Sequence, residues 1–378
     1  MNQRTFKIAH LSSVHPRYDT RIFLKLCKSL VKQNYKVFFI VADGKGNEFK
    51  NKISIVDIGI LSSGRFSRMT KTVNRIFEKG LELDCDLYHL HDPELIPIGL
   101  KLKKLGKKVI FDVHENIAFQ ILDKNYIPRF LRKLIAIIFR IYEISSLKKF
   151  DALILAENSY LKNYISLNKR IEIILNLPDH KLLKNFQKTN RDKMEIFHIG
   201  NITNARGFDK IIDALNILKK KIPNFFLHYV GNYTEELINS VDLNDINKNI
   251  KFYGPKSLLD GLEYSKNSIV GISILKPLKN YQTSYSTKVF EYMAIGLPVI
   301  TSNFKIYKDI IEKYECGICV DPNNPKEIAN ALKIIMKNPS KAMRMGLNGI
   351  KAINEKFKWE LEEKKLLRLY ESLFNQKK

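Results

Sequence analysis

The residues best suited to chemistry gather in the stretch 281–303, where side-chain hydroxyls lead into a short helical pattern. Those hydroxyls belong to Thr283, Ser284, Ser286 and Thr287. Ser and Thr just before a helix can accept hydrogen bonds from its free N–H groups, and that end of a helix carries partial positive charge. Gly296 and Pro298 end the pattern, and an apolar strand-like run follows. The stretch therefore predicts a helix start at which an anion can bind.

Glu291 falls, on this reading, in the first turn of that helix. A carboxylate is stabilised there and can accept hydrogen bonds from two neighbouring hydroxyls, which is what a ribose offers. A diphosphate next to that ribose would suit the helix end. Spacing alone is equally compatible with a first-turn charge that binds nothing.

Arg206 stands in a polar loop flanked by Gly200 and Gly207, just before a second helical pattern. A planar guanidinium matches phosphate oxygens in pairs, so an arginine at a helix start suits a diphosphate. The sequence therefore offers a second anion-binding position, although a solvated loop arginine is the alternative.

His114 and Glu115 directly follow the apolar run VIFDV and are expected at the carboxyl edge of a sheet. A histidine there can donate a hydrogen bond or carry a proton, or it can simply bond to backbone. His89 and His91 alternate onto one face beside Asp92 and could bind a metal. A third ligand would have to come from elsewhere, so no metal site is predicted.

The loop after the first strand carries a further group of polar side chains at the expected site edge. They are His15, Arg17, Asp19 and Arg21. Asp19 or Thr20 could cap the helix that follows. A histidine in a loop is usually only solvated.

Strand-length apolar runs alternate with helical patterns through both halves of the 378-residue chain, which predicts an α/β fold of two domains with parallel sheets. Ligands of such sheets bind beyond the carboxyl ends of the strands. A polar stretch at 176–192 resembles a linker, and the boundaries are placed to give 1–185, 186–356 and a C-terminal helix, 357–378. No GxGxxG or Walker pattern occurs, which argues against a dinucleotide oxidoreductase and a P-loop kinase.

The segment from Ser284 to Ile300 resembles the donor-binding motif of the retaining family 4 glycosyltransferases. That family has two glutamates seven residues apart, followed by Ala-x-Gly-x-Pro-Val. The second glutamate, which holds the nucleotide ribose, maps onto Glu291, whereas the first maps onto Thr283. This departure is similar to a branch of capsule and O-antigen transferases.

The resemblance implies further site residues. The loop from Gly200 to Arg206 is similar to the family's phosphate loop, with Arg206 at its lysine position and Asn201 where an arginine is usual. Lys288 is expected to supply the missing cation. The base is expected near the backbone of Tyr253 to Lys256, and His114 beside the reacting sugar.

The implied architecture is GT-B, with two Rossmann-like domains facing a cleft and a C-terminal helix that returns to the N-terminal domain. The first domain would bind the acceptor and the second the nucleotide sugar. The implied reaction is a metal-independent, retaining hexosyl transfer from a UDP- or GDP-sugar to a glycan, with no further cofactor.

The formal net charge of +25 favours phosphate-bearing or anionic-membrane partners. No zinc finger, RNP or helix-turn-helix pattern indicates nucleic acid. A lipid-diphosphate glycan acceptor would explain the charge by holding a cytoplasmic enzyme at the inner membrane face. The apolar stretch 134–139 is expected to face the core, and Arg129, Arg132 and Lys133 to face the membrane.

Two rivals stay open. A sugar-nucleotide epimerase of the same architecture would act on the donor alone. A nucleic-acid-binding protein would explain the charge, but neither Glu291 nor Arg206.

Overall fold

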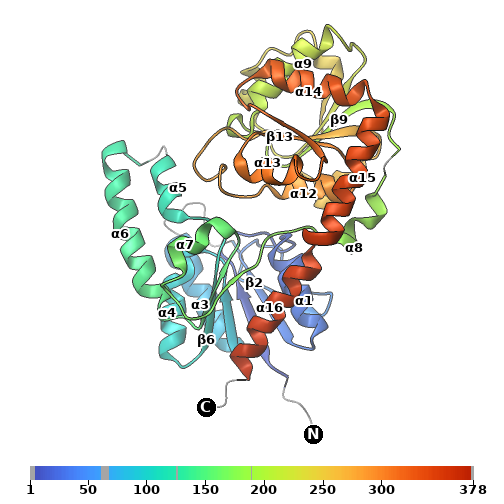
Figure 1. The fold of residues 1–378 in the computed structure, drawn as a ribbon. Coiled ribbons are helices and arrows are strands. Elements are labelled where there is room, and N and C mark those ends of the chain that lie inside the picture. Colours follow the sequence, from blue (N-terminus) through green and yellow to red (C-terminus); the bar gives the residue numbers. More distant parts are fainter. Residues whose placement is uncertain (1–4, 61–67, 125–126, 189, 376–378) are drawn as a thin grey trace. The chain divides into compact units, whose positions relative to one another are not determined.

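The structure, a computed structural model, describes residues 5–60, 68–124, 127–188 and 190–375. It divides into two α/β units, one formed by Met1–Asn176 with Leu361–Lys378 and the other by Leu177–Glu360 (Figure 1). The sequence-based boundaries at 185 and 356 are therefore displaced. Helix α8 (His180–Leu183) packs on α12 (Thr287–Ala294), and the Gln187 amide donates to the Ala294 carbonyl, so this segment belongs to the second unit.

The first unit holds an eight-stranded sheet in the order β3-β4-β2-β1-β5-β6-β7-β8, parallel except for the antiparallel edge strand β3. Its strands are β1 (Lys7–Leu11), β2 (Lys36–Val41), β3 (Glu48–Lys50), β4 (Ile53–Asp57), β5 (Leu87–Leu90), β6 (Lys108–Val113), β7 (Ala152–Leu155) and β8 (Ile171–Ile173). Strands β1, β2, β5, β6 and β7 were predicted from the sequence as apolar runs. The strands β3, β4 and β8 were not, because two are only three residues long and β4 alternates weakly.

The helices of the first unit are α1 (Lys28–Lys32), α3 (Val73–Leu83), α4 (Ile96–Lys104), α5 (Ile117–Asp123), α6 (Arg129–Leu147), α7 (Leu161–Tyr164) and α16 (Trp359–Phe374), of which α16 returns from the second unit. A π-helical turn, η1 (Ile22–Cys27), precedes α1. Side chains of the sheet alternate between its faces. One face packs on α3 and α4 in the apolar core, and the other carries the histidines and Asp112 discussed below.

The second unit holds a six-stranded, all-parallel sheet in the order β11-β10-β9-β12-β13-β14. The strands are β9 (Lys193–Ile199), β10 (Phe226–Val230), β11 (Ile250–Phe252), β12 (Ser268–Ser273), β13 (Val299–Ser302) and β14 (Gly317–Val320). The helices are α8, α9 (Phe208–Lys219), α10 (Glu235–Asn239), α11 (Leu258–Leu262), α12, α13 (Lys305–Ile311), α14 (Pro325–Met336) and α15 (Pro339–Lys356). Helices α9 and α14 cover one face of the sheet with its main core.

Helix α6 contradicts the sequence-based orientation of its apolar stretch. Leu134, Ile137 and Ile138 are exposed, and of the stretch 134–139 only Ala136 is buried. Arg132, expected at a membrane, instead donates to the carbonyls of Ile127 and Leu122. Among the described residues, no helix has the length and apolar character needed to cross a bilayer.

Candidate functional site

The start of α12 lies where the sequence placed it, but its hydroxyls do not cap it. Ser286 is the N-cap residue, with extended backbone and no side-chain capping bond, and its Oγ lies 3.4 Å from the Ser273 Oγ. The Ser286 N–H donates to the Tyr307 hydroxyl, which in turn donates to the Ser284 carbonyl. Tyr307 therefore fixes this loop. Thr287 is the first residue of the helix and is half-buried.

Glu291 is the fifth residue of α12, so its placement in the first turn was wrong. Its side chain is buried, and so is that of Lys288, one turn earlier on the same helix. The two side chains interact electrostatically, and the Glu291 carboxylate favours the charged form of the lysine. The charge of Glu291 thus acts on a neighbouring cation rather than on the helix end.

Arg206 is held by the geometry of its loop. It ends a 3-10 turn (Asn204–Arg206) that the Thr203 hydroxyl caps by accepting from the Arg206 N–H. Gly207 follows with φ +72°, which favours glycine, and α9 begins at the next residue. Lys276 fastens the loop to β12, because its N–H donates to the Ala205 carbonyl. The half-buried Arg206 guanidinium has no hydrogen-bond or ion-pair partner in the described part of the chain.

Arg206 and Lys288 form what we call the cationic cluster. A Cβ built on Gly200, at the end of β9, would come within 2.7 Å of the Lys288 Nζ, so the ammonium lies against a bare stretch of backbone. Burial and, to a smaller extent, the charge of Arg206 together lower the pKa of Lys288 to about 7, outweighing the opposite effect of Glu291. The sequence-predicted Arg206, Lys288 and Glu291 therefore come together, beside Gly200. Two cations that repel each other in a buried site create a demand for an anion.

Two other predicted residues, Thr283 and Asn201, are engaged in local structure. Thr283 is exposed, and its hydroxyl lies near the Lys279 and Asn280 carbonyls. Asn201 is also exposed and accepts from the Asn232 amide. Their roles in binding stay predictions.

Tyr253 is fixed from three sides. Its N–H donates to the Tyr229 carbonyl, its hydroxyl lies 2.8 Å from the His228 Nδ1, and its ring centroid lies 3.9 Å from that of Tyr264. Its N–H is therefore occupied, which leaves the carbonyl and the backbone that follows for a base.

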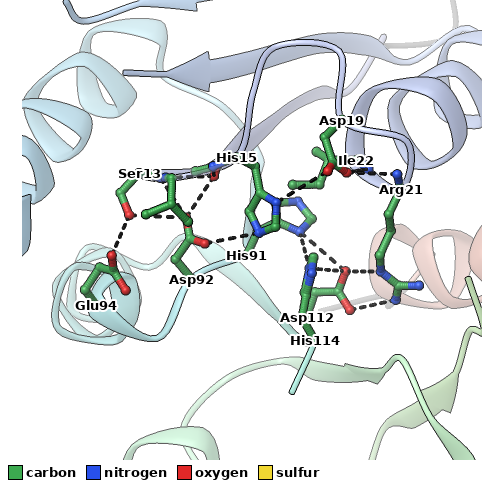
Figure 2. A network of polar contacts seen from close by, with 12 residues as sticks. Ser13, His15, Asp19, Arg21, Ile22, His91, Asp92, Glu94, Asp112 and His114 are labelled. Carbon is green, nitrogen blue, oxygen red and sulfur yellow. Dashed lines mark hydrogen bonds and ion pairs between the residues drawn. The ribbon is translucent and has the colours of Figure 1, made fainter. Parts of the chain in front are cut away.

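In the first unit, Asp112 organises a second constellation (Figure 2). Arg21 donates two hydrogen bonds, of 2.9 and 2.8 Å, to the carboxylate of Asp112, and both side chains are buried. The His114 Nε2 lies 3.0 Å from the Asp112 Oδ2 and 3.3 Å from the His91 Nδ1. Burial alone would raise the pKa of Asp112, but the charge of Arg21 and the neighbouring His114 hold it well below the ordinary value. His114 is therefore oriented by a carboxylate rather than by backbone.

His15 lies between two carboxylates. Its Nδ1 is 3.4 Å from the Asp19 Oδ2, its Nε2 is 3.3 Å from the Asp92 Oδ1, and its ring centroid is 5.0 Å from that of His114. Burial opposes the charged form, but the hydrogen bonds to Asp19 and Asp92 prevail and raise the pKa to about 10. His15 is thus a cation at neutral pH, not a solvated loop histidine.

The seven side chains that make up this histidine–carboxylate network are His15, Asp19, Arg21, His91, Asp92, Asp112 and His114. The Asp19 Oδ1 also accepts from the N–H groups of Arg21 and Ile22 at the start of η1, where the sequence offered Asp19 or Thr20 as a cap. Arg17 lies outside the network. Asp43 and Glu48 form ion pairs with Arg17, so its charge is compensated within the protein.

His10 supplies the third histidine that the sequence could not place. His10 on β1 pairs in register with His89 on β5, and the His10 Nδ1 lies 2.9 Å from the His91 Nε2. Candidate ligand atoms of these three buried residues lie within 4.8 Å of one another. Burial lowers the pKa of each histidine, so all three are neutral at pH 7. That no metal is needed stays a prediction.

Sequence reasoning missed Asp112, which holds the network together. A signal was present, because an aspartate in the middle of VIFDV interrupts an otherwise apolar strand. Asp112 and His114 also share one face by alternation. A buried carboxylate two residues before a strand-end histidine indicates that the histidine is being oriented.

Two family models together match most of the chain. The model described as glycosyl transferases group 1 matches residues 179–352, and that described as glycosyltransferase family 4 matches residues 20–181. An uncharacterized glycosyltransferase of Haemophilus influenzae is 26% identical over 334 residues, which cover 86% of this chain and 88% of the relative. The capsular polysaccharide biosynthesis glycosyltransferase CapM of Staphylococcus aureus is 24% identical over about half of each chain (53% and 52%).

Solved structures share the fold. Sucrose-phosphate synthase from Thermosynechococcus elongatus superimposes with a TM-score of 0.73 at 18% identity, covering 98% of this chain and 99% of its own. The Anabaena protein HepE in complex with UDP-glucose gives a TM-score of 0.71 at 15% identity, covering 97% of this chain and all of its own. These likenesses confirm the two-domain GT-B fold.

Proposed function

Because this chain belongs to the family 4 glycosyltransferases, we propose that it moves a hexosyl group from a nucleoside diphosphate sugar to a hydroxyl of a glycan, with retention of anomeric configuration. The cationic cluster is the observation that carries this proposal. Arg206 has no anionic partner in the described part of the chain, and Lys288 is buried close enough to Arg206 for its pKa to fall. A diphosphate is the anion that two such cations would hold.

Arg206 and Lys288 would also stabilise the leaving group, which is the nucleoside diphosphate. As the bond to the sugar breaks, charge would grow on the diphosphate, and the cations Arg206 and Lys288 would stabilise that charge. The proposal assigns this role to side chains, so the reaction would need neither a divalent metal ion nor a further cofactor. Glu291, buried beside Lys288, would accept hydrogen bonds from the ribose hydroxyls.

His114 is proposed to act on the sugar side. Its imidazole is about one-fifth exposed, whereas Asp112 behind it is fully buried. The carboxylate fixes the orientation of the ring, which is what a hydrogen-bond donor to a sugar hydroxyl requires.

The donor is proposed to be UDP- or GDP-linked, and UDP is supported by the solved complexes of HepE with UDP and glucose and with UDP-glucose. The acceptor is proposed to be a surface glycan, carried on a polyprenyl diphosphate, as in capsule or O-antigen synthesis. The relationship to CapM and the net charge of +25 support this choice. A lipid-linked acceptor would place the protein at the inner face of the plasma membrane.

Incubation of the purified chain with a panel of UDP- and GDP-sugars, with and without a lipid-linked glycan, tests the proposal. We expect transfer with one donor, insensitivity to EDTA, and an NMR coupling constant of the product that matches the anomer of the donor. Conversion of the donor with no acceptor present would instead indicate an epimerase. Salt-sensitive binding of oligonucleotides with no binding of any nucleotide sugar would refute the enzymatic assignment.

A further inference from the structure

Helix α6 presents its apolar side to solvent. Phe130, Leu134, Ile137, Ile138 and Ile141 recur at the i, i+4, i+7, i+8, i+11 spacing of one helical stripe, and all are exposed, Phe130 by 80% and Ile141 by 64%. We call these five side chains the α6 stripe. A helix of a globular protein normally turns such a stripe toward the core.

The inner side of α6 carries the polar groups instead. Glu143 is 2% exposed, lies 2.6 Å from the Arg140 Nη1 and accepts a hydrogen bond from the Tyr164 hydroxyl. Arg140 also donates to the Asn163 carbonyl. Those polar contacts, together with Ala136, fix the rotation of the helix about its axis. The contacts on the inner side of α6 therefore hold the stripe in its outward orientation.

The first unit leaves this face uncovered. Helix α5 packs beside α6, α4 contacts it as well, and Figure 1 shows the pair α5 and α6 extending beyond the sheet of the unit. Isolated apolar residues on a surface need no explanation, but a row of five large side chains along one helix marks an interaction surface.

Charge identifies the class of partner. Lys133 borders the stripe, because it lies three residues after Phe130 and four before Ile137. Arg129 lies at one end of the helix, and Lys148 and Lys149 lie at the other. All four of these basic side chains are exposed. The one acidic residue of α6 is the buried Glu143. An apolar stripe bordered by cations without exposed acids matches an anionic lipid interface, in which side chains enter the acyl boundary and cations meet headgroups.

A second copy of the chain fits less well. The stripe has coiled-coil spacing, but pairing two such helices would bring the basic residues Arg129 and Lys133 of each copy to one interface, with no exposed acid on α6 to meet them. A bilayer with anionic lipid supplies the opposite charge. The net charge of +25 extends this attraction over the whole chain.

We propose that α6 docks this protein on an anionic membrane surface by laying the α6 stripe into the headgroup–acyl boundary, while Arg129, Lys133, Lys148 and Lys149 contact anionic headgroups. At 19 residues, or roughly 28 Å, the helix lies in the plane of the bilayer and does not cross it. The orientation assigned to the stripe from the sequence was the reverse. The proposal rests on exposure and charge alone and does not depend on the proposed glycosyl transfer.

Co-sedimentation of the full chain with vesicles tests this. Wild type should bind phosphatidylcholine vesicles containing phosphatidylglycerol at least tenfold more tightly than pure phosphatidylcholine vesicles. Ile137→Glu should abolish the binding. The matched control is Leu347→Glu on α15, because Leu347 and Ile137 are both 49% exposed helical residues of similar size. The control should bind as wild type does.

Insertion is separated from simple charge attraction by Phe130→Trp. With brominated lipids the new tryptophan should be quenched, whereas Trp359, which is buried, should not. Equal binding of wild type and Ile137→Glu to anionic vesicles would overturn the proposal, since charge alone would then suffice. A second result would also overturn the proposal: the wild type dimerises in sedimentation velocity but binds no vesicles, and Ile137→Glu abolishes the dimer. The α6 stripe would then contact a second copy of the chain. None of these measurements uses donor or acceptor, so their failure is distinct from failure of the enzymatic assignment.

Discussion

The two polar constellations differ in how their charges are compensated. In the histidine–carboxylate network every cation already has its anion: Arg21 faces Asp112, and His15 lies between Asp19 and Asp92. In the cationic cluster, Arg206 has no ion-pair partner among the described residues and Lys288 is buried beside it at a lowered pKa. The first arrangement is complete without a ligand, whereas in the second Glu291 only partly offsets the burial of Lys288 and its repulsion by Arg206.

This difference implies different functions for the two regions. A fully paired network rigidifies side chains and fixes the orientation of His114, so it should contribute mainly to stability and positioning. Two cations that share one site repel each other and should contribute to ligand binding at a cost in stability. Each prediction below tests one side of this contrast.

The largest expected effect is on folding of the first unit. Asp112→Ala leaves the Arg21 guanidinium buried without its carboxylate, which should lower the free energy of unfolding by about 3–5 kcal/mol. Urea denaturation, with hydrogen exchange to assign the transition to the first unit, measures this. The control is Glu82→Ala, which removes an exposed pair with Lys79 and should have no measurable effect. Equal stability of Asp112→Ala and wild type would show that the network is not a stability element.

The next effect is on catalysis by the second unit. Arg206→Ala should lower kcat/KM about 10²–10³-fold without loss of stability, because in the proposed reaction the guanidinium would contact the leaving diphosphate, and it has no hydrogen-bond or ion-pair partner among the described residues. Arg344→Ala on α15, an exposed arginine of the same unit, is the control and should retain full activity. A change of less than threefold in Arg206→Ala would remove Arg206 from the reaction.

The pH dependence of stability should separate the regions by sign. The pKa of His15 is raised to about 10, so its contribution is complete below its unfolded pKa near 6.5 and is lost as pH rises toward 10. His15→Gln should therefore be destabilised by on the order of 2 kcal/mol at pH 6, and the difference from wild type should shrink by pH 10. The stability of both proteins, measured by urea denaturation from pH 6 to 10, gives this difference directly.

Lys288 should behave in the opposite way. Its pKa is lowered to about 7, so the folded chain binds fewer protons than the unfolded chain, and the penalty for burying it is greatest at low pH. Lys288→Met should be more stable than wild type at pH 6, and this advantage should vanish by about pH 10.5. A destabilised Lys288→Met at pH 6 would show that the lysine is compensated inside the protein after all.

The smallest effect concerns the ribose. Glu291→Gln should raise the KM for the donor about tenfold, since a hydrogen bond to a charged acceptor is replaced by a neutral one. A donor with 2′-deoxyribose isolates this contact. Wild type should discriminate against it, and Glu291→Gln should not. Undiminished discrimination in the variant would assign the ribose to another residue.

The apolar strands and the start of the helix that follows Arg206 could be predicted, because apolar periodicity and the positions of glycines are local signals. The helix beginning at Thr287 and the loop that holds Arg206 lie where they were expected. The position of Glu291 in the second turn was missed, although even the last hydroxyl residue of the run, Thr287, lies four residues before it. The outward rotation of α6 was not predictable, because it depends on Tyr164 and Asn163, which come later in the chain.

Proton uptake on donor binding tests the central claim most directly. A nucleotide sugar has no group that titrates near pH 8, so calorimetry in two buffers of different ionisation enthalpy reports the protein alone. If the diphosphate binds beside Lys288, the pKa of the lysine rises from about 7, and the wild type should take up about one proton at pH 8. Lys288→Met should take up none. Donor binding without proton uptake by wild type, or the same uptake by both proteins, would contradict the account.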